Sequence, residues 1–380
     1  MEIIVFDHNA NISGYRKRYE ELCKFKDVKL TLVIPKYLDY YNGVKTPDAI
    51  LENAQYETII LENTKNGKVH RGFYTDIIGL IKLLKKQPDI IYIFAEPEAF
   101  YALQIICLAR MFSKNSKIIL TTFININYYK TKYPYQWSFL YKWVYKYNIK
   151  RVHGIMTNTK IGFEMLRENG FKGRIAYEGL GVDLTQFRKK DVNLLKSNLK
   201  LNGFVVGFIG RIEYEKGLDT LIKAISLIKN NITVLIVGDG SYKNEIIELA
   251  KKHNVNLIVT KAVSHGGVAD YYNCMDVFVL PSRTMSHWKE QFGRVLIEAM
   301  ACGIPVIGSN SGEISNVISN AGLIFNEGDE NDLSKNIVKL MKNDSLRNEL
   351  IKLGKEHVGQ NYTWDRIALK LYGMCQDLVS

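Results

Sequence analysis

The sequence predicts an α/β fold made of two doubly wound, Rossmann-like domains that face a central cleft. Short runs rich in Ile and Val alternate with longer amphipathic segments, which is typical of βαβ units around a mostly parallel sheet. This alternation fades after residue 179 and restarts at residue 204. A chain of 380 residues is also long enough for two or more domains, at roughly 150 residues per domain.

The first half starts on a strand, because its first residues are apolar and lack the basic segment and the small-residue cleavage site of a signal peptide. Runs rich in Ile and Val predict strands at residues 2–6, 29–34, 57–61, 89–94, 117–123, 152–157 and 174–177. Amphipathic segments predict helices at residues 73–86, 98–112 and 135–147.

The second half repeats this order after a polar, weakly periodic segment at residues 179–203, which we expect to be a linker. The expected strands are residues 204–209, 233–237, 255–259, 277–280, 306–308 and 322–325. The expected helices are residues 217–229, 242–253, 293–302 and 331–342. The predicted domains are residues 1–185 and 200–362, followed by an amphipathic helix at residues 364–380.

The composition excludes several classes of protein. The apolar runs are much shorter than the roughly 20 residues that a membrane-spanning helix needs. The five cysteines lie far apart with no C-x-x-C spacing, so we expect small core residues rather than disulfides or a zinc site. These features predict a cytoplasmic protein.

The positive charge is concentrated in the first half. Residues 1–180 hold 27 Lys and Arg against 17 Asp and Glu, and no acid occurs in residues 99–163. Residues 128–151 add ten aromatic residues to this basic stretch. Lys and Arg interleaved with Trp and Tyr suit an anionic membrane surface, on the inner face of the cell membrane. A helix with an aromatic core face and a solvated Lys face is the alternative, and nucleic acid is not the expected partner.

The first motif with chemical meaning is GFIGRIEYEKG, in which a strand ends at Gly210 and a helix begins near Gly217. Glycine lets a ligand approach the backbone, and a helix N-terminus attracts anions. Arg211 and Lys216 add two cations at the same place. The motif predicts a diphosphate site; an ordinary strand-to-helix turn with solvated charges is the alternative.

The second motif is PSRTMSHWKEQFGRVLIEAMACGIPVIGS, which follows the strand expected at residues 277–280. Glu290 precedes a helix that opens near Gly293, and Glu298 lies eight residues further on. Carboxylates accept hydrogen bonds from sugar or ribose hydroxyls, and helix N–H groups bind phosphate. Two solvated glutamates are the alternative. A glycosidase pair is disfavoured, because that mechanism needs a fixed separation that sequence spacing does not show.

These motifs, in order with GDGSYKNEI and DVFVLPSRT, resemble the donor domain of retaining GT-B glycosyltransferases of the family-4 type, also called glycosyl transferases group 1. The resemblance is strong over about residues 150–365 and weaker over residues 89–181, where it rests on IYIFAEPEAF and KTKYP. It implies a GT-B fold, a nucleotide-sugar donor in the second domain, no metal and no other cofactor. It also implies that the helix at residues 364–380 packs back on the first domain.

The resemblance implies roles for individual residues. Arg211 and Lys216 match the pair that neutralises the diphosphate, Glu298 matches the acceptor of ribose hydroxyls, and Glu290 matches the group that holds the transferred sugar. The expected catalytic residues are Arg211, Lys216 and Glu290. The expected donor-binding residues are Gly210, Arg211, Lys216, Glu290, Gln291, Phe292, Gly293, Val295 and Glu298.

The first domain would bind the acceptor, and there the sequence departs from the family. Many members have a glycine pair after the first strand, where this chain has a single glycine followed by basic residues. Many also have a His after the strand that ends near residue 123, where this chain reads FININ. The acceptor-side candidates are therefore Gly14, Arg16, Glu96, Glu98 and Asn125, although the two glutamates could instead cap a helix.

The resemblance thus implies a retaining, metal-independent hexosyltransferase that uses a UDP- or GDP-linked sugar. The basic, aromatic segment at residues 128–151 favours an acceptor on a lipid-linked or cell-surface glycan precursor. Transfer to a soluble sugar phosphate, with Arg16 as a phosphate ligand, and epimerisation of a sugar nucleotide are the enzymatic alternatives. A protein that only binds polyanions or membrane surfaces is the non-enzymatic alternative.

Overall fold

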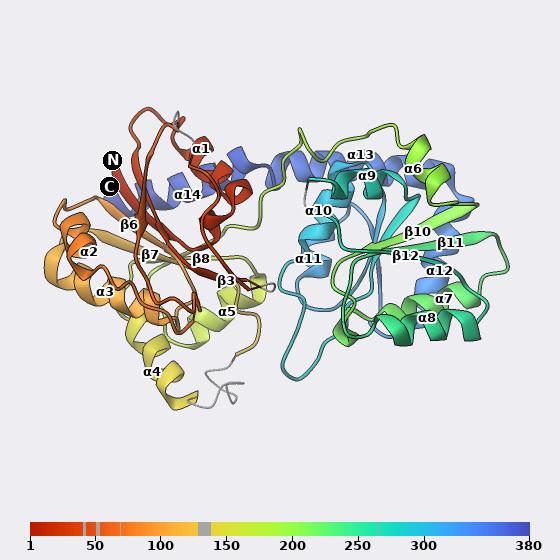
Figure 1. Cartoon of the computed structure of the whole chain (residues 1–380), viewed down its shortest axis with the longest axis horizontal. Helices are drawn as coiled ribbons and strands as arrows, with labels where there is room; N and C mark the ends of the chain where they lie inside the picture. The colour runs from red at the N-terminus through yellow and green to blue at the C-terminus, as the bar shows by residue number, and fades with distance from the viewer. Residues whose placement is uncertain (41–42, 51–53, 69, 128–137, 265) are drawn as a thin grey trace. The chain divides into compact units, whose positions relative to one another are not determined.

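The computed structural model describes residues 1–40, 43–50, 54–68, 70–127, 138–264 and 266–380. The chain divides into two compact units, residues Met1–Gly179 with Trp364–Ser380 and residues Leu180–Thr363 (Figure 1). Each unit is a parallel β-sheet with helices packed on it. The prediction of an α/β fold with two doubly wound domains is therefore confirmed.

The first unit is built on a seven-stranded sheet with the order β5-β2-β1-β6-β7-β8-β9, in which all neighbours are parallel. Its strands are β1 (Glu2–Asp7), β2 (Lys29–Pro35), β5 (Glu57–Leu61), β6 (Ile90–Phe94), β7 (Lys117–Thr122), β8 (Gly154–Thr157) and β9 (Arg174–Tyr177). Successive side chains of a strand point to opposite faces. In β1, Ile3 and Val5 enter one core, and Ile4 and Phe6 enter the other.

Helices cover both faces of this sheet. On the face of Ile3 lie α1 (Lys17–Leu22) and α14 (Trp364–Val379), whose Leu22 and Leu371 share that core. Figure 1 shows α14 running beside α1 in the first unit. The other face is covered by α2 (Ile77–Leu84), α3 (Phe100–Phe112), α4 (Ser138–Ile149) and α5 (Lys160–Glu168).

Two local features of the first unit differ from the sequence-based expectation. Helix α2 begins four residues later than expected, because the Asp76 side chain caps it by accepting a hydrogen bond from the Gly79 N–H at 2.8 Å. A short antiparallel hairpin of β3 (Leu38–Tyr40) and β4 (Gly43–Lys45) was not expected. A strand of three residues is too short to show the alternation of apolar and polar side chains that predicts a strand.

The second unit is built on a six-stranded sheet with the order β12-β11-β10-β13-β14-β15. Its strands are β10 (Phe204–Ile209), β11 (Ile232–Val237), β12 (Asn256–Thr260), β13 (Val277–Leu280), β14 (Val306–Ser309) and β15 (Leu323–Phe325). Its helices are α6 (Asn193–Asn198), α7 (Leu218–Ser226), α8 (Lys243–Lys252), α9 (Val268–Asn273), α10 (Arg294–Ala301), α11 (Ile314–Ile318), α12 (Glu330–Lys342) and α13 (Asp344–Asn361).

Residues 180–203, expected as a linker, form part of the second unit instead. Phe187 is completely buried, and its ring centroid lies 6.2 Å from that of Tyr272. The backbone N–H of Lys190 donates to the Asn273 side-chain oxygen at 3.0 Å. A single buried aromatic residue in a polar segment creates no periodic pattern, so the sequence did not indicate this attachment.

Each sheet has a position where the strand order reverses. In the first unit β1 lies between β2 and β6, and in the second unit β10 lies between β11 and β13. Ligands of open α/β sheets bind outside the carboxyl ends of the strands at such a position. The loops that follow β10 and β13 are therefore the first place to look for a site.

Candidate functional site

The loops after β10 and β13 meet at the edge of the second sheet. The first loop carries Arg211 and Lys216, and the second carries Glu290. They are joined through the backbone, because the Arg283 N–H donates to the Glu215 carbonyl at 2.9 Å. The sheet thus brings together Lys216 and Glu290, which lie 74 positions apart in the chain.

Glycine at position 217 makes this close approach possible. Gly217 has a φ of 68°, and a Cβ atom on it would lie 2.0 Å from the carbonyl oxygen of Pro281. Any larger residue would meet both backbone strain and a collision between the two loops. The tight turn at Gly217 holds Lys216 next to the second loop.

Lys216 lies between a carboxylate and an aromatic ring. Its Nζ is 2.7 Å from Glu290 Oε2, and these two side chains are only 13% and 11% exposed. The Ser282 hydroxyl donates to the same oxygen at 2.8 Å. On another side, Nζ lies 4.6 Å from the centroid of the Trp288 ring, which is cation–π distance. Lys216 and Glu290, both predicted site residues, are in direct contact.

Glu298 is held in a separate hydrogen-bond set on α10. Its Oε2 accepts a hydrogen bond from the Tyr272 hydroxyl at 2.9 Å, and its Oε1 lies 3.1 Å from Arg294 Nε. Burial, together with the neighbouring Glu298 carboxylate, raises the pKa of Tyr272 well above its ordinary value, so the hydroxyl remains a donor. The carboxylate of Glu298 is therefore held by a hydrogen bond from Tyr272 and an ion pair with Arg294.

The remaining donor-side candidates divide between exposed and core positions. The Arg211 side chain is 47% exposed, with Glu215 Oε1 at 3.9 Å, a separation at which an exposed ion pair contributes little. Gln291 is exposed and Val295 is half-buried in the first turn of α10. Phe292 is buried, and its ring packs edge-on against Tyr362, so only its backbone could reach a ligand.

Gly293 begins α10 in the left-handed conformation, with a φ of 78°. The first N–H groups of a helix have no partner within the helix and carry a partial positive charge. The start of α10 follows Glu290 by four residues, which places an anion-attracting helix end next to the Lys216–Glu290 contact. Within the described ranges, no group of three or more His, Cys, Asp or Glu side chains could hold a metal ion.

The acceptor-side glutamates lie at the carboxyl edge of the first sheet. Glu96 follows β6, and its carboxylate accepts hydrogen bonds from the Thr122 hydroxyl at 2.7 Å and the Phe123 N–H at 2.8 Å, both on the neighbouring strand and its loop. Burial raises the pKa of Glu96 to about 7. Burial and the Glu96 carboxylate raise the pKa of Glu98 to about 8. Asn125, also buried, follows on the same loop as Phe123.

Neither glutamate caps α3. This helix begins after Ala99, and no side chain accepts a hydrogen bond from its first turn at the cap position. Glu96 instead links the β6 and β7 loops at the edge of the sheet.

Arg16 does not fit the predicted phosphate-binding role. It is 2% exposed, and its guanidinium donates to the carbonyls of Ala10 at 2.7 Å, Ala49 at 2.6 Å and Asp48 at 2.9 Å. A guanidinium committed to backbone carbonyls in this way holds the loop together. Gly14 has open space around its Cα, with no atom within 4 Å of the position that a Cβ would occupy, so its backbone is accessible.

Several residues around the site were not assigned from the sequence. Ser282 and Trp288 lie within the second motif, where the aromatic ring close to Glu290 was the available hint. Tyr272 contacts Glu298 from α9, and no motif connects two residues 26 positions apart. Arg283 forms an ion pair with Asp219 and lies 4.5 Å from the Tyr214 ring centroid, which further ties the two loops together.

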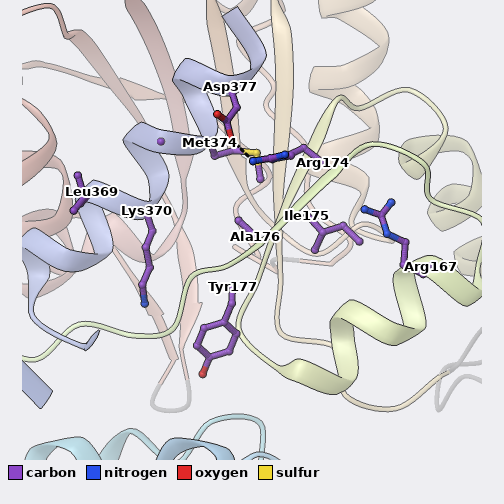
Figure 2. A pocket seen from close by; sticks show the side chains of 10 residues that line it. Arg167, Arg174, Ile175, Ala176, Tyr177, Leu369, Lys370, Met374 and Asp377 are labelled. Carbon is purple, nitrogen blue, oxygen red and sulfur yellow. Dashed lines mark hydrogen bonds and ion pairs between the residues drawn. The ribbon is translucent and has the colours of Figure 1, made fainter. Parts of the chain in front are cut away.

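The first unit also contains a cavity of about 340 Å³ between β9 and α14 (Figure 2). Figure 2 shows Lys370 and Tyr177 on one side and the Arg174–Asp377 ion pair, 2.6 Å long, on another. Burial lowers the pKa of Lys370 to about 8. The cavity contains none of the residues predicted to bind donor or acceptor.

Two doubly wound units, with cations, carboxylates and a helix N-terminus at the switch point of the second, have the architecture of the GT-B class. Residues 190–357 match the family model described as glycosyl transferases group 1. This match lies within the second unit and bears out the resemblance found in its motifs.

Curated relatives and solved structures agree with this assignment. The capsular polysaccharide biosynthesis glycosyltransferase CapM of Staphylococcus aureus is 32% identical over 202 residues, 51% of this chain and 50% of the relative. A GDP-mannose-dependent phosphatidylinositol monomannoside mannosyltransferase of Corynebacterium glutamicum is 28% identical over 207 residues, 52% of this chain and 54% of the relative. The chain thus spans about half the length of the curated relatives it matches.

The similarity of fold extends over the whole chain. The Anabaena protein Alr3699/HepE, solved in complex with UDP, has a TM-score of 0.75 at 16% identity and covers 99% of this chain and 100% of its own. A sucrose-phosphate synthase of Thermosynechococcus elongatus has a TM-score of 0.71 at 20% identity, with 100% and 99% coverage. Both units therefore have the GT-B fold.

Proposed function

We propose that the protein transfers a hexosyl group from a UDP- or GDP-linked sugar to an acceptor hydroxyl, with retention of anomeric configuration and without a metal ion. The observation that carries this proposal is the contact of Lys216 with Glu290 beside the start of α10, at the switch point of a group 1 glycosyl transferase domain. Cations and a helix N-terminus suit a diphosphate, and the carboxylates suit hydroxyl groups.

In this proposal the donor is held by charge at one end and by hydroxyl contacts at the other. Arg211, Lys216 and the N–H groups at Gly293 to Val295 bind the diphosphate. Glu298 accepts hydrogen bonds from the ribose, and Glu290 accepts them from the transferred sugar. The two cations take the place of a metal ion in neutralising the leaving group.

The reaction breaks the bond between the anomeric carbon and the diphosphate oxygen, and the electron pair leaves with the diphosphate. The acceptor oxygen forms the new bond to the anomeric carbon on the same face, and its proton passes to a phosphate oxygen of the leaving group. Catalysis then rests on positioning and on fixed positive charge around the leaving diphosphate. Glu96 and Asn125, at the carboxyl edge of the first sheet, are the proposed ligands of the acceptor.

The acceptor we propose is a lipid-linked or cell-surface glycan precursor at an anionic membrane surface. On α4 the side chains of Phe139 and Trp143 are 68% and 53% exposed and lie among Lys142 and Lys146, which favours a lipid surface. Tyr141, Val144 and Tyr145 of α4 are buried, so part of the aromatic content serves the core. Residues 128–137 of the predicted surface lie outside the described residues.

The relatives support this choice of acceptor by their names, which refer to capsular polysaccharide and to a phosphatidylinositol mannoside. Transfer to a soluble phosphate remains the second candidate, because another relative is named D-inositol 3-phosphate glycosyltransferase. No helix in the described ranges is long and apolar enough to cross a membrane. Attachment at the surface through α4 is the mode of membrane contact that we propose.

The test is a transfer assay with radiolabelled UDP- and GDP-sugars, offered either to a bacterial membrane lipid extract or to a panel of soluble sugar phosphates, with and without EDTA. Label in the lipid phase, unaffected by EDTA and with retained configuration by NMR, supports the proposal. Label in soluble sugar phosphates only would establish the second candidate. Transfer that EDTA abolishes would refute the metal-independent mechanism.

Membrane contact is tested separately by sedimentation with vesicles of neutral or anionic lipid. The double variant Phe139→Ala/Trp143→Ala should lose binding to anionic vesicles, whereas Phe163→Ala, a substitution at another exposed aromatic residue of the first unit, should retain it. Equal binding of the two variants would refute the role of α4.

A further inference from the structure

We propose that the cavity between β9 and α14 in the first unit binds a small phosphate monoester of the size of a sugar phosphate. None of the residues proposed to bind the donor or the acceptor lines this cavity. The proposal therefore goes beyond the proposed function and does not depend on it. It follows from the charge of the side chains that line the cavity, from the groups that position them, and from the space between them.

Positive charge converges on the cavity from three elements of the first unit. Among the described residues that line it are three cations, Arg167 of α5, Arg174 of β9 and Lys370 of α14, and one carboxylate, Asp377 (Figure 2). Guanidinium groups match the geometry of phosphate oxygens and bind them through paired hydrogen bonds. A lining of this composition favours an anion with several oxygen atoms.

Neutral groups hold the Arg167 guanidinium in place. Its Nη1 donates to the backbone carbonyls of Phe171 and Gly173, both at 2.9 Å. These two hydrogen bonds use one nitrogen of the guanidinium and leave its positive charge in place, because a carbonyl carries no net charge. Arg167 is thus positioned in advance for an anion.

Lys370 is also positioned by a backbone carbonyl. Its Nζ donates to the Glu178 carbonyl at 3.0 Å, whereas the Glu178 carboxylate forms its ion pair with Arg18. Burial lowers the pKa of Lys370 to about 8. An anion in the cavity would favour the ammonium form of this side chain, because a nearby opposite charge stabilises the charged state.

The space in the cavity fits a phosphate with one sugar ring. Its volume is about 340 Å³, near the lower end of the range for sites that bind small molecules. Tyr177, Leu369 and Met374 add apolar surface for a carbon skeleton. Gly373 lines the cavity from within α14, and a Cβ atom on it would meet nothing within 4 Å. Glycine is a poor helix former, so its place here keeps the cavity open at a cost in helix stability.

The experiment is isothermal titration of the whole chain in a phosphate-free buffer with inorganic phosphate, glucose 6-phosphate and glucose. Wild type should bind glucose 6-phosphate most tightly, inorganic phosphate more weakly, and glucose not at all. Arg174→Gln and Lys370→Met should each weaken the binding of glucose 6-phosphate by about tenfold, through loss of a charged hydrogen bond. Arg174 is 60% exposed, so its substitution should not unfold the chain.

Two matched variants test the role of charge. Lys29→Gln removes a cation from another exposed ion pair of the first unit, with Glu2 at 2.6 Å, and should leave the affinity unchanged. Asp377→Asn removes the carboxylate from the lining and releases Arg174 from its ion pair. This variant should bind glucose 6-phosphate about threefold more tightly, within the range of an exposed ion pair.

Two further measurements test the location. Gly373→Leu fills the cavity without a change in charge, and should abolish binding without a fall in melting temperature, because leucine is the better helix former. In hydrogen exchange of the wild type, glucose 6-phosphate should slow exchange in peptides that cover residues 174–177 and 369–377.

The outcomes separate this cavity from the donor site. Binding that is weakened in Lys370→Met, abolished in Gly373→Leu and retained in Lys216→Met supports the proposal. Loss of binding in Lys216→Met with retention in Lys370→Met would place the phosphate at the donor site and overturn the proposal. Unchanged affinity in Lys370→Met or Gly373→Leu, equal binding of glucose, or absence of binding of both phosphates to wild type would also overturn it, and none of these results would bear on donor binding.

Discussion

The guanidinium of Arg18 lies 2.9 Å from Glu178 Oε1 in the first unit, where the two side chains are 2% and 0% exposed. The Phe94 ring centroid lies 4.6 Å from this guanidinium, and the Tyr92 hydroxyl lies 3.2 Å from the same Glu178 oxygen. Lys370 of α14 donates to the Glu178 carbonyl at 3.0 Å. This buried pair connects α1 with the end of β9 and with the C-terminal helix.

Removal of one member of this pair should be far more damaging than removal of both. Arg18→Met should lower the free energy of unfolding by about 3–5 kcal/mol, because it removes the main counter-charge of the buried Glu178 carboxylate. The double variant Arg18→Met/Glu178→Leu should recover most of this loss. Urea unfolding measures both values, and a double variant as unstable as the single one would contradict the account.

Gly217→Ala should disrupt the contact between the two site loops. The added Cβ would lie 2.0 Å from Pro281 O at a residue with a φ of 68°, so we expect a loss of about 1–3 kcal/mol and weaker donor binding. Gly359→Ala is the matched control, because that position lies within α13 with nothing near its Cβ. There alanine should stabilise by up to about 1 kcal/mol. Comparable melting temperatures for the two variants would show that the loops do not depend on Gly217.

Lys216→Met should reduce kcat/KM by about 10²–10³-fold, as expected for loss of a charge that stabilises the leaving group. Lys251→Met, on the exposed side of α8, is the control and should leave kcat/KM unchanged. Steady-state kinetics of the two variants, with the donor sugar that the binding experiments identify, provide the comparison. A Lys216→Met enzyme with wild-type kcat/KM would mean that this lysine does not contact the diphosphate.

The first unit should lose stability as the pH rises from about 4.5 to 8. Burial raises the pKa of Glu98 to about 8 and that of Glu96 to about 7, so over this range the folded chain binds more protons than the unfolded chain. Stability then falls by about 1.4 kcal/mol per pH unit for each such proton. Glu98→Gln keeps a neutral side chain at every pH.

The free energy of unfolding of Glu98→Gln should therefore equal that of the wild type near pH 5. Near pH 8 it should exceed the wild-type value by about 1 kcal/mol or more, which corresponds to a shift of about one pKa unit. Urea unfolding at the two pH values provides the comparison. A difference between variant and wild type that stays constant with pH would indicate that Glu98 titrates as an ordinary exposed carboxyl group.

The strands and the switch-point loops could be predicted from the sequence because their information is local. Buried parallel strands are continuous runs of Ile and Val, and the two motifs place Arg211, Lys216 and Glu290 in the loops that follow such runs. The direct contact of Lys216 with Glu290 follows once β10 and β13 are neighbours.

What could not be predicted depends on partners from distant parts of the chain. Arg16 is expected beside the acceptor because it follows Gly14 in the loop after the first strand, whereas its guanidinium is buried by the carbonyls of Ala10, Asp48 and Ala49. The contact of Tyr272 with Glu298 arises from the packing of α9 near α10, which no sequence motif specifies.

We propose that the second unit binds a nucleotide diphosphate sugar through its cations. The most direct measurement is a thermal-shift titration of wild type and Arg211→Ala with UDP-, GDP- and ADP-linked sugars. A ligand at 100 times its Kd stabilises the folded state by about 2.7 kcal/mol. We predict a rise in Tm with one nucleotide family that is lost in Arg211→Ala; an equal rise in both proteins, or no rise with any of the sugars, would contradict donor binding through these cations.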